Sequence, residues 1–318
     1  MKLLVKILKI LLVIILLIFG ITLIYEQYSR YSAKKELVDS GTYSDVGGFK
    51  LHYVKKGEHD ATVVFESGLD FRGYHVWNKV QNEVSKFATT VSYDRAGILK
   101  SQRGSKEKSC ENMAYDLHVM LEKIQVKKPY ILVAHSLGGL DVRTYVKEYP
   151  DEVKGVILVD STHPELLERA PEALALKLKI PHTPQWLANV LSITGVTRIA
   201  MNSLFNSDDN YSEDFKKDIN ANLNRTVASV NDEIKKLEDL SNEAKGITFG
   251  DIPLTVIAST KMDNKEMEPF KEFFQGLQKD SLKLSTNSNI VWAKNSGHFI
   301  QLEQPEIVIE AIKKLSEL

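Results

Sequence analysis

Ser136 stands where a buried strand would turn sharply into a helix. Residues 130–133 are aromatic, aliphatic or β-branched, and the sequence Ala-His-Ser-Leu-Gly follows them. A serine at such a turn adopts a strained backbone, and strand and helix come so close that positions two before and two after it tolerate almost no side chain. Gly138 meets this requirement, and Ala134 departs from the usual glycine by one methyl group. The pattern predicts a nucleophile elbow with Ser136 as the nucleophile.

A serine hydroxyl is a weak nucleophile at neutral pH, so Ser136 needs a base to take its proton and an acid to orient that base. His298 follows a Ser-Gly pair, after the last predicted strand at residues 290–293. It comes late in the chain, in the order serine, acid, histidine that accompanies such elbows. We therefore expect His298 to be the general base. The remaining histidines are expected to occupy structural or surface positions: His52, His59, His75, His118, His135, His163 and His182.

Four short motifs follow one another along the chain. They are Tyr-Asp-Arg-Ala-Gly at 93–97, the elbow, Val-Ile-Leu-Val-Asp at 156–160 and Ser-Gly-His at 296–298. In this order they resemble the α/β-hydrolase family, over roughly residues 45–318 apart from a middle insertion, and are similar to its lipase-, esterase- and peptidase-like members. The resemblance implies the α/β-hydrolase fold and a serine hydrolase that works through an acyl-enzyme, with neither a metal nor an organic cofactor.

Two aspartates compete for the role of the acid. Asp160 ends the predicted sixth strand, residues 155–160, at the sheet edge where ligands bind in such folds, and pancreatic-lipase-like members of the family place their acid there. Asp263 follows the predicted seventh strand, residues 252–259, which is the commoner position in the family, but the usual Gly-x-x-Asp spacing is absent. We favour Asp160 as the catalytic acid and keep Asp263 as the alternative.

An oxyanion that forms during attack on a carbonyl needs two hydrogen-bond donors. The resemblance implies that one is the backbone amide of Leu137, directly after the nucleophile at the start of a helix. The other would be the backbone amide of Leu69. Ser67 stands where the family usually shows histidine, but Gly68 retains the residue that permits the turn.

Strand-like and helix-like segments alternate through the core. Residues 49–54 show period-two alternation and are predicted to form a hairpin-like pair with the buried strand 62–66. The following elements are a helix near 74–86, a strand at 89–93, a helix at 111–124, a strand at 130–135, a helix at 138–149 and a strand at 155–160. This alternation favours a mostly parallel sheet with helices on both faces. Asp94 and Arg95, in the loop after residues 89–93, are expected to fix that loop through a local ion pair.

The predicted core, residues 43–163 and 251–318, is interrupted by a helical cap or lid at 164–250, after the sixth strand. Strand-like runs vanish there, and helical stretches follow one another at 164–178, 184–204 and 214–244. The front of this cap is strongly apolar, and we expect its side chains to pack on the core, with an acyl-chain pocket as the alternative: Leu166, Leu167, Leu174, Leu176, Trp186, Leu187, Val190 and Leu191.

Residues 1–25 form an apolar segment of their own. Counted from Leu3, the run reaches about the 20 residues that a helix needs to cross a bilayer. The flanking charges favour a cytoplasmic N-terminus and an extracytoplasmic catalytic domain. These charges are Lys2, Lys6 and Lys9 before the run, and Glu26, Arg30, Lys34 and Lys35 after it. We predict an uncleaved transmembrane signal-anchor at 1–25 and a stalk at 26–42. A cleaved signal peptide is the alternative, but no Ala-x-Ala site follows the run.

Composition is typical of a globular enzyme, with 43% hydrophobic and 26% charged residues. A net charge of -1 gives no electrostatic footprint for nucleic acid. Cys110 is the only cysteine, so disulfides within the chain and cysteine-based metal sites are excluded, and we expect Cys110 to be a buried residue on a helix.

The sequence therefore predicts a membrane-anchored serine hydrolase that cleaves a carboxylic ester of a small-molecule or lipid-like acyl substrate through Ser136, His298 and Asp160. A peptidase, an amidase or an acyltransferase on the same three residues is the alternative. A ligand-binding or signalling protein without catalysis on the same scaffold is a third possibility, since a fold by itself does not fix a function. The oligomeric state is open.

Overall fold

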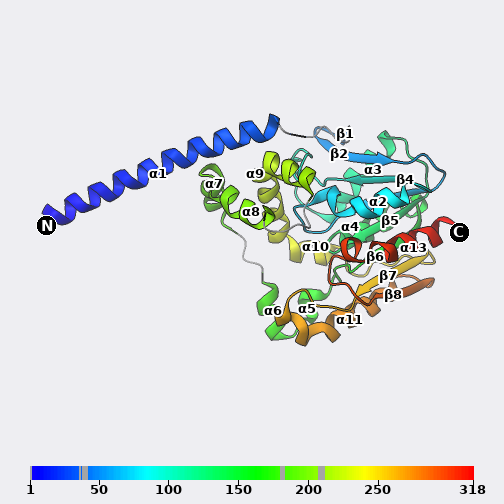
Figure 1. Ribbon diagram of the computed structural model, residues 1–318. Coiled ribbons are helices and arrows are strands. Elements are labelled where there is room, and N and C mark those ends of the chain that lie inside the picture. Colours follow the sequence, from blue (N-terminus) through cyan, green and yellow to red (C-terminus); the bar gives the residue numbers. More distant parts are fainter. Residues whose placement is uncertain (1, 36, 38–41, 180–182, 207–211) are drawn as a thin grey trace.

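The computed structural model describes residues 2–35, 37, 42–179, 183–206 and 212–318 (Figure 1). In this described part, eight strands form one sheet in the order β1-β2-β4-β3-β5-β6-β7-β8. Pairing is antiparallel between β1 and β2 and between β2 and β4, and parallel elsewhere. The predicted mostly parallel α/β architecture is confirmed. The strands are β1 Thr42–Asp45, β2 Lys50–Lys56, β3 Thr62–Glu66, β4 Thr89–Tyr93, β5 Tyr130–His135, β6 Val153–Val159, β7 Leu254–Ser259 and β8 Ser288–Ala293.

Helices cover both faces of the sheet because the central strands are apolar on both sides. Val63 and Phe65 of β3 face one hydrophobic cluster with α2 and α13, whereas Val64 between them faces a second cluster with α3 and α4. The core helices are α2 Asn78–Val84, α3 Cys110–Lys123, α4 Gly138–Glu148, α11 Lys271–Asp280, α12 Ile300–Glu303 and α13 Pro305–Ser316. Short 3₁₀ helices lie at Gly73–Trp77, Pro150–Glu152, Lys265–Phe270 and Ser281–Leu284. Cys110 is buried at the first position of α3, as expected.

The predicted hairpin-like pair is wrong. β2 does not pair with β3, because β4 lies between them and pairs with each. The reason is burial: every residue of β3 is buried, as a central strand requires, whereas β2 has exposed and half-buried residues among its buried ones and suits a place near the sheet edge. A short connection between two strand-like runs therefore did not make them neighbours.

The cap contains more helices than the three predicted stretches. Pro171 precedes α6, Gly195 adopts a φ of +71° between α7 and α8, and Lys236 separates α9 from α10. Proline and a left-handed glycine both end regular helix, so the first two stretches are broken at Pro171 and Gly195. The cap helices are α5 Leu166–Arg169, α6 Glu172–Leu178, α7 Gln185–Ile193, α8 Val196–Asn206, α9 Glu213–Lys235 and α10 Leu237–Glu243.

The N-terminal segment is one continuous helix, α1 Lys2–Lys35, which projects from the domain and passes beside α7, α8 and α9 (Figure 1). It is long and apolar enough to cross a membrane, and its most apolar stretch is not buried against the rest of the molecule. Helix α1 continues through the predicted boundary between span and stalk at residue 25, so the first part of the stalk, up to Lys35, is helical.

Candidate active site

The elbow at Ser136 is built by close backbone packing. Ser136 lies between β5 and α4 with a φ of +51°, a left-handed conformation that non-glycine residues rarely adopt. A β-carbon at Gly138 would lie 2.7 Å from the carbonyl oxygen of Ser67, and one at Gly68 would lie 2.6 Å from Cβ of Ser136. These positions exclude any side chain, as predicted for Gly138. The tight turn leaves the Ser136 hydroxyl directed out of the sheet edge rather than into the core.

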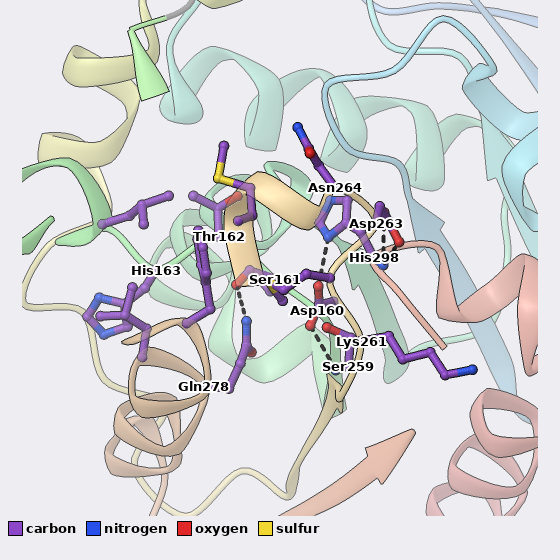
Figure 2. A pocket seen from close by; sticks show the side chains of 15 residues that line it. Asp160, Ser161, Thr162, His163, Ser259, Lys261, Asp263, Asn264, Gln278 and His298 are labelled. Carbon is purple, nitrogen blue, oxygen red and sulfur yellow. Dashed lines mark hydrogen bonds and ion pairs between the residues drawn. The ribbon is translucent and has the colours of Figure 1, made fainter. Parts of the chain in front are cut away.

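The structure brings Ser136, His298 and Asp160 together from three separate strand ends. The His298 Nε2 and Ser136 Oγ atoms are 2.9 Å apart, and His298 Nδ1 is 2.7 Å from Asp160 Oδ2. The other Asp160 oxygen accepts a hydrogen bond of 2.9 Å from the backbone amide of Ser259 (Figure 2). This arrangement fixes the carboxylate, and the carboxylate in turn fixes the imidazole with Nδ1 protonated and Nε2 facing the serine.

Asp263, the alternative acid, lies against the backbone of His298 rather than its ring. Its two carboxylate oxygens accept from the backbone amide of His298 at 3.3 and 3.2 Å (Figure 2). A β-carbon at Gly297 would lie 1.6 Å from Asp263 Oδ1, so the glycine of the Ser-Gly-His motif makes room for this carboxylate. The geometry therefore gives Asp160 the ring contact and Asp263 a contact that holds the histidine loop.

The pKa of His298 is raised above its ordinary value of about 6.5. Burial acts to lower this pKa, but the hydrogen bond that His298 donates to Asp160 outweighs the effect of burial, together with the negative charges of Asp160, Asp263 and Asp70. The His298 side chain keeps 38% of its surface exposed, which leaves the ring open to a substrate. An imidazole with a raised pKa is a stronger base when it is neutral.

The amides expected to bind an oxyanion belong to Leu69 and Leu137. In the part of the chain that the structure describes, the backbone amides of Leu69 and Leu137 donate to no other residue. Leu137 precedes α4, and the turn through Gly68 passes directly over Ser136. Both amides thus lie near Ser136, and that of Leu137 is at the positive end of α4.

Arg95 supports the turn at residues 67–69, but its ionic partners differ from the prediction. Its guanidinium donates to the carbonyl oxygens of Ser67 and Gly68, the latter at 2.8 Å, and forms a 2.5 Å ion pair with Glu233 of α9. Asp94 pairs instead with the buried His52, and Asp94 Oδ2 lies 2.8 Å from His52 Nδ1. The expected local pair is therefore wrong, because a buried guanidinium needs several acceptors and finds them across the cap boundary.

Two acidic residues around Arg95 were not anticipated from the sequence. Burial raises the pKa of Glu66 to about 7, although the charge of Arg95 counteracts it. Burial also acts on Glu233, but there the charges of Arg95 and Lys108 prevail, so the pKa of Glu233 is lowered. Glu233 lies in the last turn of the polar helix α9 without any local motif, and its role depends on contacts with distant residues.

His135 occupies the packing position that was expected beside the nucleophile. It is buried, and its Nε2 atom lies 2.9 Å from the carbonyl oxygen of His298. Burial and the nearby His298 lower the pKa of His135, so the ring is neutral and donates its proton to that carbonyl. His75 pairs with Asp218 of the cap in a buried contact of 2.9 Å. The prediction for His182 lies outside the described residues.

A cavity of about 300 Å³ lies beside His298 and Asp160, between the sheet edge and α5 and α11 (Figure 2). Polar atoms of Thr162 and Asn264 reach it, but much of its wall is apolar. The apolar part comes from Leu166, Met262, Met267, Phe274 and Leu277. Its size and lining suit a small apolar group.

The expected packing of the cap side chains holds only in part. Leu174 is fully buried, and Leu166 lines the cavity. Leu176, Trp186 and Val190 are exposed, so the prediction that they pack on the core is wrong. Helix α7 packs mainly on α8, and its Leu187 and Leu191 are half-buried, whereas Trp186 and Val190 lie on its exposed side.

Comparison with known proteins agrees with the fold. The family model described as the alpha/beta hydrolase fold matches residues 62–305, more than half of the chain. The protein belongs to the α/β-hydrolase fold family.

Three similar proteins illustrate the range of this family. The probable transporter efuK of Hormonema carpetanum is 25% identical over 92% of this chain, which spans only 44% of that longer protein. An epoxide hydrolase of Bacillus megaterium has 17% identity and a TM-score of 0.63, over 87% of this chain and 100% of its own. A thermophilic esterase of Thermogutta terrifontis has 19% identity and a TM-score of 0.58, over 87% of this chain and 96% of its own. At such identities the solved structures show the fold alone.

Proposed function

We propose that this protein is a serine hydrolase that cleaves carboxylic esters through an acyl-enzyme at Ser136. The observation that supports this most is the hydrogen-bonded line from Ser136 through His298 to Asp160, with contacts of 2.9 and 2.7 Å. It combines a nucleophile, a base and an orienting acid in one hydrogen-bonded chain near the amides of Leu69 and Leu137. Epoxide opening fits less well, because an epoxide has no carbonyl oxygen that could accept hydrogen bonds from those amides.

The proposed reaction follows from this geometry. Ser136 Oγ attacks the ester carbonyl carbon while its proton passes to His298 Nε2, and the carbonyl oxygen becomes an oxyanion held by the amides of Leu69 and Leu137. The carbon–oxygen bond to the alcohol then breaks, and His298 returns the proton to the departing alcohol. Water attacks the acyl-enzyme by the same route, so that the acid is released and Ser136 is restored.

The substrate we propose is a small-molecule or lipid-like acyl ester. The cavity of about 300 Å³ beside His298 has an apolar wall that would accept a short acyl or alkyl group. An amide would follow the same steps, and an acyltransferase would use an alcohol in place of water. These alternatives share the acyl-enzyme, whereas a protein that only binds ligands would not form one.

We further propose that α1 anchors the domain to a membrane as a single-pass signal-anchor. Helix α1 has the length and the exposed apolar surface for a span. Lys2, Lys6 and Lys9 stand at its N-terminal end, which favours a cytoplasmic N-terminus and an extracytoplasmic domain.

The test of the proposed activity uses the full-length protein with a short p-nitrophenyl ester and a fluorophosphonate probe. The wild type is expected to hydrolyse the ester and to be labelled at Ser136, because only an activated serine reacts with the probe. Ser136→Ala should lower kcat by about 10⁴-fold or more. Ser85→Ala, which changes a serine at the end of α2, is the matched control and should keep the wild-type rate. Full activity in Ser136→Ala would contradict the proposal, and labelling without ester turnover would direct the search to amides and acyl acceptors.

A further inference from the structure

The pair of cap helices α7 and α8 exposes a continuous set of large apolar side chains. Trp186, Val190 and Ile193 follow one another at spacings of four and three residues, so they share one face of α7. Exposure is high for apolar residues, reaching 69% for Trp186 and 54% for Ile199. We call this surface the α7–α8 face, and it consists of Trp186, Val190, Ile193, Val196 and Ile199.

The α7–α8 face also has no charged neighbours on its own helices. Among the described residues 183–206, Arg198 is the only residue with a charged side chain, although 26% of the whole chain is charged. Arg198 does not reach the surface, because its side chain is only 3% exposed. Two helices that expose apolar groups and no charge are unusual on a surface that faces water.

Helix α1 contacts the cap at the junction of α7 and α8. Arg198 Nε donates to Glu26 Oε2 at 2.7 Å, and Asn224 of α9 donates to Glu26 Oε1 at 2.9 Å. Glu26 is fully buried in this contact. Gly195 approaches the same turn of α1 so closely that an added β-carbon would lie 3.3 Å from Tyr25 and Glu26.

This contact sets the level of the α7–α8 face along α1. The apolar run of α1 has no charge between Ile10 and Tyr25, so Glu26 is the first charged residue after the span. The face is therefore attached where α1 would leave the bilayer, and α7 and α8 lie beside α1 in Figure 1. Tyr25, Tyr28 and Tyr31 are exposed on the same part of α1. Tyrosine and tryptophan are enriched at the level of lipid headgroups.

We propose that the α7–α8 face rests in the interface of the bilayer that α1 spans, with lipid as its partner. The inference rests on the proposed membrane anchor and extends it from one helix to the cap. The cap would then meet the membrane at two places, through α1 itself and through the side chains of Trp186, Val190 and Ile193. The buried pair of Glu26 and Arg198 would hold these two places in a fixed relation.

The test measures lipid contact at three positions in the full-length protein, reconstituted in phosphatidylcholine vesicles. In a Cys110→Ala background, single cysteines replace Ile14 in the span, Val190 on the α7–α8 face and Tyr115 on α3. Each carries an environment-sensitive fluorophore, and lipids with nitroxide groups at different depths quench it. We expect quenching at position 14 by deep nitroxides, at 190 by shallow ones, and at 115 by neither.

The outcomes separate this inference from the anchor. Quenching at 14 without quenching at 190 would overturn the contact of the α7–α8 face and leave the anchor standing, whereas no quenching at 14 would overturn the anchor itself. A fluorophore at 190 that is shielded from lipid only at high protein concentration would indicate a second copy of the chain as the partner, and would overturn the inference.

A second measurement needs no cysteine substitution. Trp77 is buried and Trp292 is partly buried, whereas Trp186 is the tryptophan with a highly exposed side chain. Brominated lipids should therefore quench part of the tryptophan fluorescence of the wild type, and Trp186→Phe should lose that part. The variant should still hydrolyse the soluble ester at the wild-type rate, since Trp186 lies outside the site. Equal quenching in both proteins would overturn the inference.

Discussion

The sheet edge around Ser136 and the joint between α1 and the cap hold their charged groups in opposite ways. At the sheet edge, His298 keeps 38% and Asp160 14% of the side chain exposed, and each is held by contacts on more than one side. At the joint, Glu26 is fully buried and Arg198 is 3% exposed, and their charges face each other. Groups that carry out chemistry must meet a substrate, whereas a sealed pair serves to fix how two elements dock.

The largest effect is expected at the sheet edge. Asp160→Asn removes the charge that orients His298, and it should lower kcat for ester hydrolysis by about 10³-fold to 10⁴-fold, because the imidazole then favours the wrong tautomer. Steady-state kinetics would measure the loss of kcat, and an unchanged circular dichroism spectrum would show that the variant is folded. If Asp263→Asn caused the larger loss instead, the role of the acid would move to Asp263.

The joint should respond in stability rather than in catalysis. Glu26→Gln leaves the guanidinium of Arg198 buried without its counter-charge, which costs about 3–5 kcal/mol of the stability of the contact. Hydrogen exchange of the full-length protein should show faster exchange in α8, with ester hydrolysis per folded molecule unchanged.

Two further variants control the Glu26 experiment. The double variant Glu26→Met with Arg198→Met replaces the pair by apolar groups. It should recover most of the protection of α8 against hydrogen exchange. Glu83→Gln removes a carboxylate from an exposed ion pair with Lys86 and should change nothing measurable. Protection in α8 that survives Glu26→Gln would show that the pair does not hold the joint.

The smallest effect concerns the pH profile. Since His298 must be neutral to accept a proton, activity should fall on acidification as pH passes through its raised pKa, above about 6.5. Asp263→Asn removes one of the charges that raise this pKa, so the acidic limb should move towards lower pH. The rate on the plateau should stay within about tenfold of the wild type, well short of the loss expected for Asp160→Asn. A limb that moves towards higher pH, or does not move, would contradict the assigned cause of the shift.

The sheet edge could be predicted from the sequence because its requirements are local. Ala134 and Gly138 flank Ser136 at fixed spacing, and His298 follows a Ser-Gly pair after a strand. The choice between Asp160 and Asp263 could not be made from spacing alone, since both follow neighbouring parallel strands. The ring contact of Asp160 becomes visible only when the strands are placed side by side.

Two sets of contacts could not be predicted: the joint, and the contacts of Arg95 beside the turn at residues 67–69. In both, the paired residues lie far apart in the chain. Glu26 and Arg198 are separated by 172 positions, and Arg95 and Glu233 by 138. Each of these residues stands in a segment where a charged side chain normally faces water. The predicted pairing of β2 with β3 failed for a related reason. The short connection between these two strands does not reveal that β4 lies between them in the sheet.

The buried position of Glu26 bears on how a water-soluble form of the enzyme should be produced. A cut made at the start of the globular domain, near Thr42, would remove the carboxylate of Glu26, to which Arg198 and Asn224 both donate, and leave the Arg198 charge without its counter-charge. A cut just before Tyr25 keeps this carboxylate and about the last three turns of α1, while it discards the apolar run. The choice of the first residue thus decides whether the purified domain retains an intact cap.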